Sequence, residues 1–194
     1  MSQLFIPAAF LRGGTSKGLF FHARDLGLTA TETPEAIEGD GALMALLDAL
    51  RRAAGVAMGL AVTPEAVPLA NPGIALVAPP VPYRALDGRI WPAASHDLAI
   101  RMLSMERAHR AVPLTGGLCA AVACFIAGTL PNQLAALGRA GGEVRLGTPS
   151  GILTLGAEME RRRDGWNATS AGVFRTARRL MQGAVAVPMT LMDK

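Results

Sequence analysis

Aromatic side chains are scarce in this sequence, which has six Phe, two Trp and one Tyr among 194 residues. A core must therefore be built mainly from Ala, Leu, Val, Ile and Met. Charged residues are also few, at 18%, whereas hydrophobic residues make up 51%. This balance excludes an intrinsically disordered chain and allows one folded domain or two small ones. The 22 Gly and 13 Pro favour many turns and short strands over a helical bundle.

Cysteine is nearly absent. The two cysteines, Cys119 and Cys124, lie five positions apart in an Ala-rich segment. On a helix they point in different directions and cannot form a disulfide bond, and no Cys/His spacing fits a zinc site. Apolar surroundings raise the pKa of a thiol, so we interpret both as core residues of a reduced, cytoplasmic protein.

Long apolar runs are missing as well. The longest run, residues 118–127, is too short to span a bilayer. The first residues lack the basic and apolar regions of a secretory signal. We therefore expect no membrane association and a cytoplasmic location.

Neither sign of charge is strongly in excess, because 19 basic and 15 acidic residues give a net charge of +4. This charge suits anionic small molecules as well as nucleic acid. Basic residues cluster at 161–163 and 175–179. Without interleaved aromatic residues, such clusters are more typical of a solvated or carboxylate-binding face than of a nucleic-acid interface. Arg175 and Arg178 are candidates for bidentate carboxylate binding.

The pattern of apolar residues predicts a β-rich domain wrapped around one apolar helix over residues 115–127. Asp40 is placed to cap another helix over residues 42–54, with Gly55 as its end. A third helix is expected to begin at Ser95 and to continue to His109. The expected strands span residues 3–8, 18–23, 73–79, a hairpin around 86–91, and the segments 142–147, 151–160, 166–177 and 183–189.

The stretch FLRGGTSKGLFF, residues 10–21, places two glycines and two hydroxyls between apolar residues. Its backbone N–H groups, together with Arg12 and Lys17, can hold an anion. The glycine spacing is not that of a Walker A motif. The alternative is an ordinary glycine turn between strands that carries a solvated lysine.

Two further turns are candidates for binding an anion. In SMERAHRAVPLTGG, residues 104–117, a glycine turn opens the apolar helix, and the N–H groups that begin this helix would face a bound carboxylate. His109 in the same stretch is either an acid–base group or a half-buried structural histidine, and the second is favoured because the sequence shows no partner for it. In GTPSGIL, residues 147–153, Ser150 lies in a turn that could face a ligand.

Six segments, in chain order, resemble one family. They are LRGGTSKGLFF (11–21), MGLA (58–61), IALVAPP (74–80), DLAIRMLSM (97–105), TPSGILTL (148–155) and RTARRLMQG (175–183). Together they are similar to the PrpF family, which comprises 2-methylaconitate cis-trans isomerases and 4-oxalomesaconate tautomerases. The resemblance implies an α+β, diaminopimelate-epimerase-like fold, in which two β-barrel-like domains each surround a central helix and the active site lies between them. It also implies small unsaturated di- and tricarboxylate substrates, and no metal or organic cofactor.

The chain departs from the family in its length. Residues 1–21 resemble a remnant of the N-terminal domain and residues 22–194 resemble the C-terminal domain, so most of the first domain has no counterpart. The join near LFFHARDLG, where the two family segments look alike, suggests an internal deletion. The stretches that hold the family's proposed catalytic lysine and cysteine have no match here. Glu106 replaces the family's usual glycine, and Arg110 stands where a second histidine is frequent.

The resemblance and the motifs together predict an isomerase of small unsaturated tricarboxylates that shifts an allylic proton by acid–base catalysis. Lys17 is the local candidate for the catalytic group. The predicted substrate-binding residues are Arg12, Gly13, Gly14, Thr15, Ser16, Ser104, Met105, Thr115, Gly116, Gly117 and Ser150. The expected partner is a small carboxylate rather than nucleic acid or membrane, with self-association through the exposed cleft face as a further expectation.

Two alternatives stay open. The chain could be a catalytically inactive remnant that serves as a binding or assembly module, since loss of one lobe exposes apolar surface. It could also bind nucleic acid through residues 161–179, which predicts a steep dependence of binding on salt.

Overall fold

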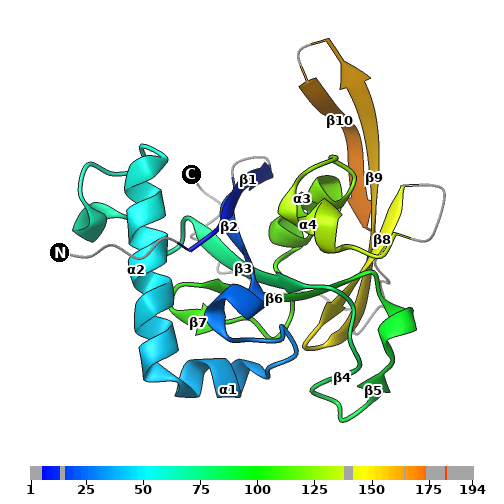
Figure 1. Ribbon diagram of the computed structural model, residues 1–194, viewed down its shortest axis with the longest axis horizontal. Helices are drawn as coiled ribbons and strands as arrows, with labels where there is room; N and C mark the ends of the chain where they lie inside the picture. The colour runs from blue at the N-terminus through cyan, green and yellow to red at the C-terminus, as the bar shows by residue number, and fades with distance from the viewer. Residues whose placement is uncertain (1–5, 14–15, 138–141, 164, 174–181, 183–194) are drawn as a thin grey trace.

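A computed structural model describes residues 6–13, 16–137, 142–163, 165–173 and 182, and in these residues the centre is a mixed sheet of eight strands (Figure 1). The strand order is β1-β2-β3-β6-β8-β9-β10, with β7 paired to β6. The strands are β1 (Ala9–Gly13), β2 (Ser16–His22), β3 (Gly73–Ala78), β6 (Leu98–Ser104), β7 (Arg107–Ala108), β8 (Glu143–Thr148), β9 (Gly151–Arg162) and β10 (Gly165–Val173). A separate short hairpin pairs β4 (Tyr83–Arg84) with β5 (Ile90–Trp91).

Two helical crossovers join the parallel strand pairs and cover opposite faces of the sheet. Strands β2 and β3 run parallel, and between them lie α1 (Pro34–Gly39) and α2 (Gly41–Ala57). Strands β6 and β8 are also parallel, with α3 (Leu114–Cys124) and α4 (Leu130–Leu134) between them. Parallel strands require such long connections. In Figure 1, α1 and α2 lie on one side of the sheet and α3 and α4 on the other. Short 3-10 turns span Ala23–Leu26, Pro64–Ala66 and Ala93–Ser95.

The central strands are buried on both faces, because successive residues of a strand point to opposite sides. In β2, Leu19 and Phe21 join the hydrophobic core beneath α2, whereas Phe20 joins the core around α3. Strand β3 alternates in the same way, with Ile74 on the α2 side and Ala75 on the α3 side. These strands therefore read as continuous apolar runs.

The helix predicted from Asp40 is confirmed. The carboxylate of Asp40 accepts a hydrogen bond from the backbone N–H of Leu43 at 2.9 Å, which caps α2. The predicted end at Gly55 is wrong, because α2 continues to Ala57. Gly55 instead faces Val67, and a Cβ at this position would lie 2.5 Å from a methyl group of that valine. This glycine permits close packing and does not end the helix.

The small-residue helix is also confirmed, as α3. Its buried residues are Gly117, Cys119, Ala120, Ala121, Ala123 and Cys124. Burial raises the pKa of Cys119 to about 11 and that of Cys124 to about 12. Both thiols are therefore protonated near neutral pH, as the sequence predicted for core cysteines.

The helix expected from Ser95 is wrong. Residues 98–104 form the central strand β6, which pairs with β3 on one side and with β7 and β8 on the other. An apolar run buried on both faces has no alternation, so its spacing did not exclude a helix. Asp97, near the start of the expected helix, accepts hydrogen bonds from the backbone and guanidinium of Arg145 on β8.

Other strand predictions are largely confirmed. Strands were expected over 73–79, 142–147 and 151–160 and form there as β3, β8 and β9. The expected strand at 3–8 is wrong over residues 6–8, which have no strand, because the first strand is β1. The expected strand at 183–189 and the basic residues 175–179 lie outside the described residues. Among the helices that the structure describes, none is long and apolar enough to cross a membrane.

Candidate functional site

A cavity of about 290 Å³ opens where the start of α3 meets the central sheet. Four segments far apart in the sequence line it: β2, the loop that precedes β3, the end of β6 with the residues that follow it, and the first turns of α3. The lining residues are Gly18, Phe20, Ala70, Asn71, Gly73, Met102, Leu103, Ser104, His109, Pro113, Thr115, Gly116 and Cys119. An apolar pocket with a few polar groups is the usual form of a small-molecule site.

Close packing between α3 and β6 shapes the floor of this cavity. A Cβ on Gly116 would clash with the end of the Met102 side chain. The first residues of α3 thus reach the sheet, and the positive end of the helix dipole lies at the cavity. This arrangement favours a bound carboxylate near Thr115 and Gly116.

The polar centre of the cavity is a contact between Ser104 and His109. Ser104 Oγ and His109 Nε2 lie 2.6 Å apart, which is a strong hydrogen bond between a hydroxyl and an imidazole. The backbone N–H of His109 donates to the carbonyl of Met102 at 2.8 Å, which fixes the chain on the far side of the turn. Burial lowers the pKa of His109. The imidazole is therefore neutral at pH 7.

A strained turn brings these two side chains together. Between β6 and β7, Met105 and Glu106 have φ angles of 53° and 59°. Positive φ at both central residues matches a two-residue hairpin turn that usually contains Asn and Gly. Positive φ strains the backbone of residues other than glycine, and strained residues of this kind are frequent at functional sites.

Helix α1 holds the strained turn in place through its carboxylates. Glu38 Oε1 accepts a hydrogen bond from the backbone N–H of Ala108 at 2.9 Å, and its other oxygen lies 3.6 Å from Arg107. Arg110 forms a 2.5 Å ion pair with Glu35. These contacts tie the residues on both sides of His109 to a helix on the opposite face of the sheet.

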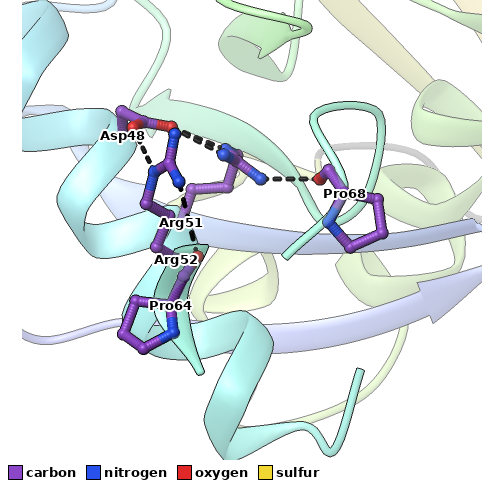
Figure 2. A network of polar contacts seen from close by, with 5 residues as sticks. All are labelled: Asp48, Arg51, Arg52, Pro64 and Pro68. Atoms are coloured by element: carbon purple, nitrogen blue, oxygen red, sulfur yellow. Dashed lines mark hydrogen bonds and ion pairs between the residues drawn. The ribbon is translucent and has the colours of Figure 1, made fainter. Parts of the chain in front are cut away.

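A second network fixes the loop that forms another wall of the cavity (Figure 2). The carboxylate of Asp48 on α2 binds both Arg51 and Arg52. Arg51 is only 3% exposed and donates to the carbonyl of Pro68 at 2.7 Å, whereas Arg52 donates to the carbonyl of Pro64. The segment that follows Pro68 provides the lining residues Ala70 and Asn71.

The same loop also contacts the strained turn. The backbone N–H of Met105 donates to the carbonyl of Leu69 at 3.2 Å. A small hollow of about 30 Å³ between Arg51 and Ser104 shows that the α2 network lies directly behind the cavity wall. Helix α2 is thus connected to the site through contacts, although none of its residues lines the cavity.

The predicted site residues do not all meet at this cavity. Ser104, Thr115 and Gly116 line it. Met105 lies at the tip of the turn and is 62% exposed, and Gly117 packs against Leu155 and Val112 in the core. Ser150 donates its hydroxyl to the carbonyl of Arg110 at 2.6 Å and so supports the chain beside His109.

The described part of the opening glycine stretch lies in the paired strands β1 and β2. Arg12 pairs with Lys17 and Gly13 with Ser16 along this hairpin, and Gly18 then lines the cavity. Gly14 and Thr15, between the two strands, lie outside the described residues. The hairpin thus brings the motif to the edge of the cavity through its backbone.

Sequence reasoning missed the partner of His109 and the contribution of Asn71. The error at His109 follows from the helix predicted over 95–109, since a helix would not form the hairpin that places Ser104 at its ring. The two non-glycine residues of the turn gave no hairpin signal. Among the described residues, no group of three or more Cys, His, Asp and Glu side chains is placed to hold a metal ion.

A sequence model of the family described as PrpF protein matches residues 22–188. The chain belongs to the PrpF family. This PrpF-family chain is 38% identical over 172 residues to a 2-methyl-aconitate isomerase of Shewanella oneidensis, with 88% of the chain and 43% of that protein covered. It is 34% identical over 175 residues to a 3-methylitaconate isomerase of Eubacterium barkeri, with 87% and 44% covered.

A solved structure shares the fold of this PrpF-family chain. The crystal structure of a methylitaconate-delta-isomerase superposes with a TM-score of 0.77 at 31% identity, and covers 88% of the chain and 44% of that structure. The chain therefore spans less than half the length of the curated relatives it matches. The matched region includes the whole cavity except Gly18 and Phe20.

Proposed function

We propose that this chain is an isomerase of small unsaturated tricarboxylates of the 2-methylaconitate and aconitate type, acting by a cofactor-free allylic proton shift. The observation that carries the proposal is the convergence of three predicted motifs on one cavity. Gly18 belongs to the opening glycine stretch, Ser104 belongs to the DLAIRMLSM segment, and Thr115 and Gly116 lie in the first turn of α3. The named relatives isomerise small carboxylates.

The proposed fold is diaminopimelate-epimerase-like. Residues 22–194 form one β-barrel-like domain around α3, and residues 1–21 are a fragment of the other domain. The curled sheet with α3 on one face supports this assignment (Figure 1). The similar solved structure supports it as well.

In the proposed reaction, a base removes a proton from the carbon next to the double bond and an acid returns one at the other end of the allylic system. The charge that develops on the adjoining carboxylate must be stabilised by N–H groups and cations. The described lining residues carry no formal charge at neutral pH. Lys17, one residue before the lining Gly18, is the proposed cation and candidate proton-transfer group.

Carboxylate binding is assigned to two regions. The start of α3 and Ser104 bind from inside the cavity, and the opening stretch binds from its edge through Arg12, Gly13, Gly14, Thr15 and Ser16. We assign supporting roles to three predicted residues: Met105 shapes the turn, Gly117 allows α3 to approach the sheet, and Ser150 fixes the chain beside His109. The volume of about 290 Å³ is at the small end of the range for ligand pockets, which suits a substrate of this size.

The proposal is tested by NMR in heavy water with 2-methylaconitate, trans-aconitate and 4-oxalomesaconate. We expect deuterium incorporation or isomer conversion with at least one of them. Lys17→Ala should abolish turnover or weaken ligand binding, whereas Lys194→Ala serves as a matched control far along the chain. A folded protein that exchanges none of the three substrates would contradict the proposed activity.

A second candidate is a binding or assembly module without activity. It is favoured by the observation that the chain spans only 43% of its relative from Shewanella oneidensis. Large apolar side chains such as Phe10 on β1 and Leu114 on α3 are exposed, which favours self-association through the surface that carries them. Sedimentation combined with the exchange assay distinguishes the two candidates. A well-folded monomer in sedimentation that also shows turnover would exclude the inactive module. In either case we propose a cytoplasmic location.

A further inference from the structure

The contact between Ser104 and His109 has the chemistry of a proton-transfer group. Both side chains line the cavity, and their polar atoms are 2.6 Å apart. The other polar side chains in the described lining belong to Asn71, Thr115 and Cys119. The amide and the hydroxyl do not titrate near neutral pH, and the thiol remains protonated because burial raises its pKa to about 11. Among the described lining groups, the imidazole is thus the one able to exchange a proton.

The surroundings of His109 keep the imidazole available as a proton acceptor. Burial lowers its pKa, so that the ring is neutral at pH 7. The charged residues on both sides of it, Arg107 and Arg110, are bound to Glu38 and Glu35 on α1. The facing elements β2, β6 and α3 contribute no formal charge to the described lining at neutral pH. Lys17 immediately precedes the lining residue Gly18 in the sequence of β2.

Hydrogen bonds from other parts of the chain hold the backbone between Ser104 and His109. Two residues other than glycine adopt positive φ between Ser104 and His109. Glu38 binds the N–H of Ala108, and the carbonyl of Leu69 binds the N–H of Met105. Strain that persists in this way is typical of functional positions. The hydroxyl and the imidazole are therefore fixed relative to each other before a ligand binds.

We propose that His109, acting through the hydroxyl of Ser104, accepts the substrate proton and returns it, an assignment that rests on the proposed isomerase function. The C–H bond next to the double bond breaks as its proton passes to Ser104 Oγ, while the serine proton passes to His109 Nε2. The electron pair spreads over the double bond and the adjoining carboxylate. The proton then returns to the other end of the allylic system by the reverse relay. Substrate and product are isomers, so no oxidant, reductant or co-reactant is needed.

The direct test compares His109→Gln with wild type in the deuterium-exchange assay. Glutamine can keep a hydrogen bond to Ser104 but cannot accept a proton. We expect the exchange rate to fall by about 10²- to 10⁴-fold, the usual contribution of general acid–base catalysis, with little change in ligand affinity. His22→Gln is the matched control, because His22 is also buried but does not line the cavity.

Two further measurements separate catalysis from folding. Ser104→Ala should lose the relay, whereas Ser104→Thr keeps a hydroxyl and should retain most of the rate. The wild-type rate should also rise with pH through the lowered pKa of His109 and then level off, because only the neutral ring accepts a proton. The residual rate of His109→Gln should lack this rise.

The outcomes distinguish this assignment from the proposed function. Exchange by His109→Gln within threefold of wild type would overturn the role of His109 and leave the isomerase function standing. A folded wild type that exchanges no substrate would overturn the function itself, and the relay with it.

If His109→Gln does not fold, the wild type is used instead. The pKa of its His109 ring is measured by NMR with and without propane-1,2,3-tricarboxylate, a saturated analogue of the substrate. We expect the bound carboxylates to raise the pKa of His109 and to leave that of His22 unchanged. An unmoved His109 pKa in the ligand-bound protein would overturn the assignment.

Discussion

The two faces of the central sheet are packed by different means. On the α2 face, long leucine side chains fill the core, and the helices are fixed by charged side chains such as Asp48 and Arg51. On the α3 face, the buried residues of the helix are all Gly, Ala or Cys, and the helix lies close to the strands. The cavity opens on this second face. The α2 face therefore supplies rigidity, and the α3 face supplies the site.

The connection between the faces passes through short polar contacts. Arg51 holds the carbonyl of Pro68 at the start of one cavity wall, and Glu38 holds the backbone N–H of Ala108 beside His109. These contacts run from α1 to strand β7 and from α2 to the loop that precedes β3. We therefore expect changes on the α2 face to affect ligand binding indirectly, through position, and changes on the α3 face to affect it directly.

The largest expected effect comes from removing core volume on the α2 face. Leu47 is 1% exposed, and Leu47→Ala should lower the free energy of unfolding by about 2–5 kcal/mol. The neighbouring Leu46 is 37% exposed, so Leu46→Ala should cost less than about 1 kcal/mol. Urea unfolding measures both. Equal losses would contradict the assignment of Leu47 to the core.

Arg51→Met is expected to have the next largest effect. It removes a buried cation that binds Asp48 and Pro68, and should cost about 2–3 kcal/mol because Asp48 keeps Arg52 as a partner. Ligand affinity should fall as well, since the wall at Asn71 loses its anchor.

Arg52→Met is the matched control for this substitution. Its side chain binds the same carboxylate but is 30% exposed, so we expect a smaller loss of stability than for Arg51→Met, and unchanged affinity. Isothermal titration with trans-aconitate compares the two variants. Unchanged affinity in Arg51→Met would show that the α2 network does not position the cavity wall.

The prediction of these two faces from sequence succeeded for local signals and failed for long-range ones. The cap at Asp40 and the helical spacing after it gave α2, and the small residues around Cys119 gave α3. Residues 98–104 were wrongly predicted as a helix, because an apolar run buried on both faces suits either element. Its strand state depends on pairing with β3 and β8 and on the contact between Asp97 and Arg145, 48 positions away.

The candidate site was predicted in part for the same reason. Ser104, Thr115 and Gly116 were placed in the site from motifs, and all three line the cavity. His109 was favoured as a structural residue, because its partner becomes visible only once residues 104–109 are read as a hairpin. The anchoring of Asn71 by Arg51 depends on a contact across 17 positions that no motif indicates.

Acidification should lower the free energy of unfolding by less than these substitutions do. Burial lowers the pKa of His22, His96 and His109, so each ring is neutral in the folded protein at neutral pH. The unfolded chain binds these protons near pH 6.5. Stability is therefore full above that pH and falls as the pH drops toward the lowered folded pKa values.

Urea midpoints at pH 7.5 and 5.5 measure this effect. His96 is the most buried of the three, and its Nε2 has no hydrogen-bond partner among the described residues. His96→Gln should reduce the difference between the two midpoints, whatever its effect at pH 7.5. If the urea midpoint of the wild type is no lower at pH 5.5 than at pH 7.5, the histidines are not buried in the neutral form.

The smallest expected effect is a gain in stability from a substitution in the turn between β6 and β7. Glu106 has a φ of 59°, which glycine adopts without strain. Glu106→Gly should stabilise the turn by up to about 1 kcal/mol, offset by the greater backbone entropy of glycine in the unfolded chain. Thermal unfolding checks this change, with Glu160→Gly as the control at an ordinary strand position. A loss of stability at Glu106 as large as at Glu160 would show that the turn is not strained.

The central claim is that the ligand binds on the α3 face and that the α2 face only supports it. The most direct test is NMR mapping of backbone amides during titration with trans-aconitate. We expect the largest shifts at Gly18, Asn71, Ser104 and Gly116, with small shifts along α2. Largest shifts along α2, or at the β9–β10 hairpin around Trp166, would contradict it.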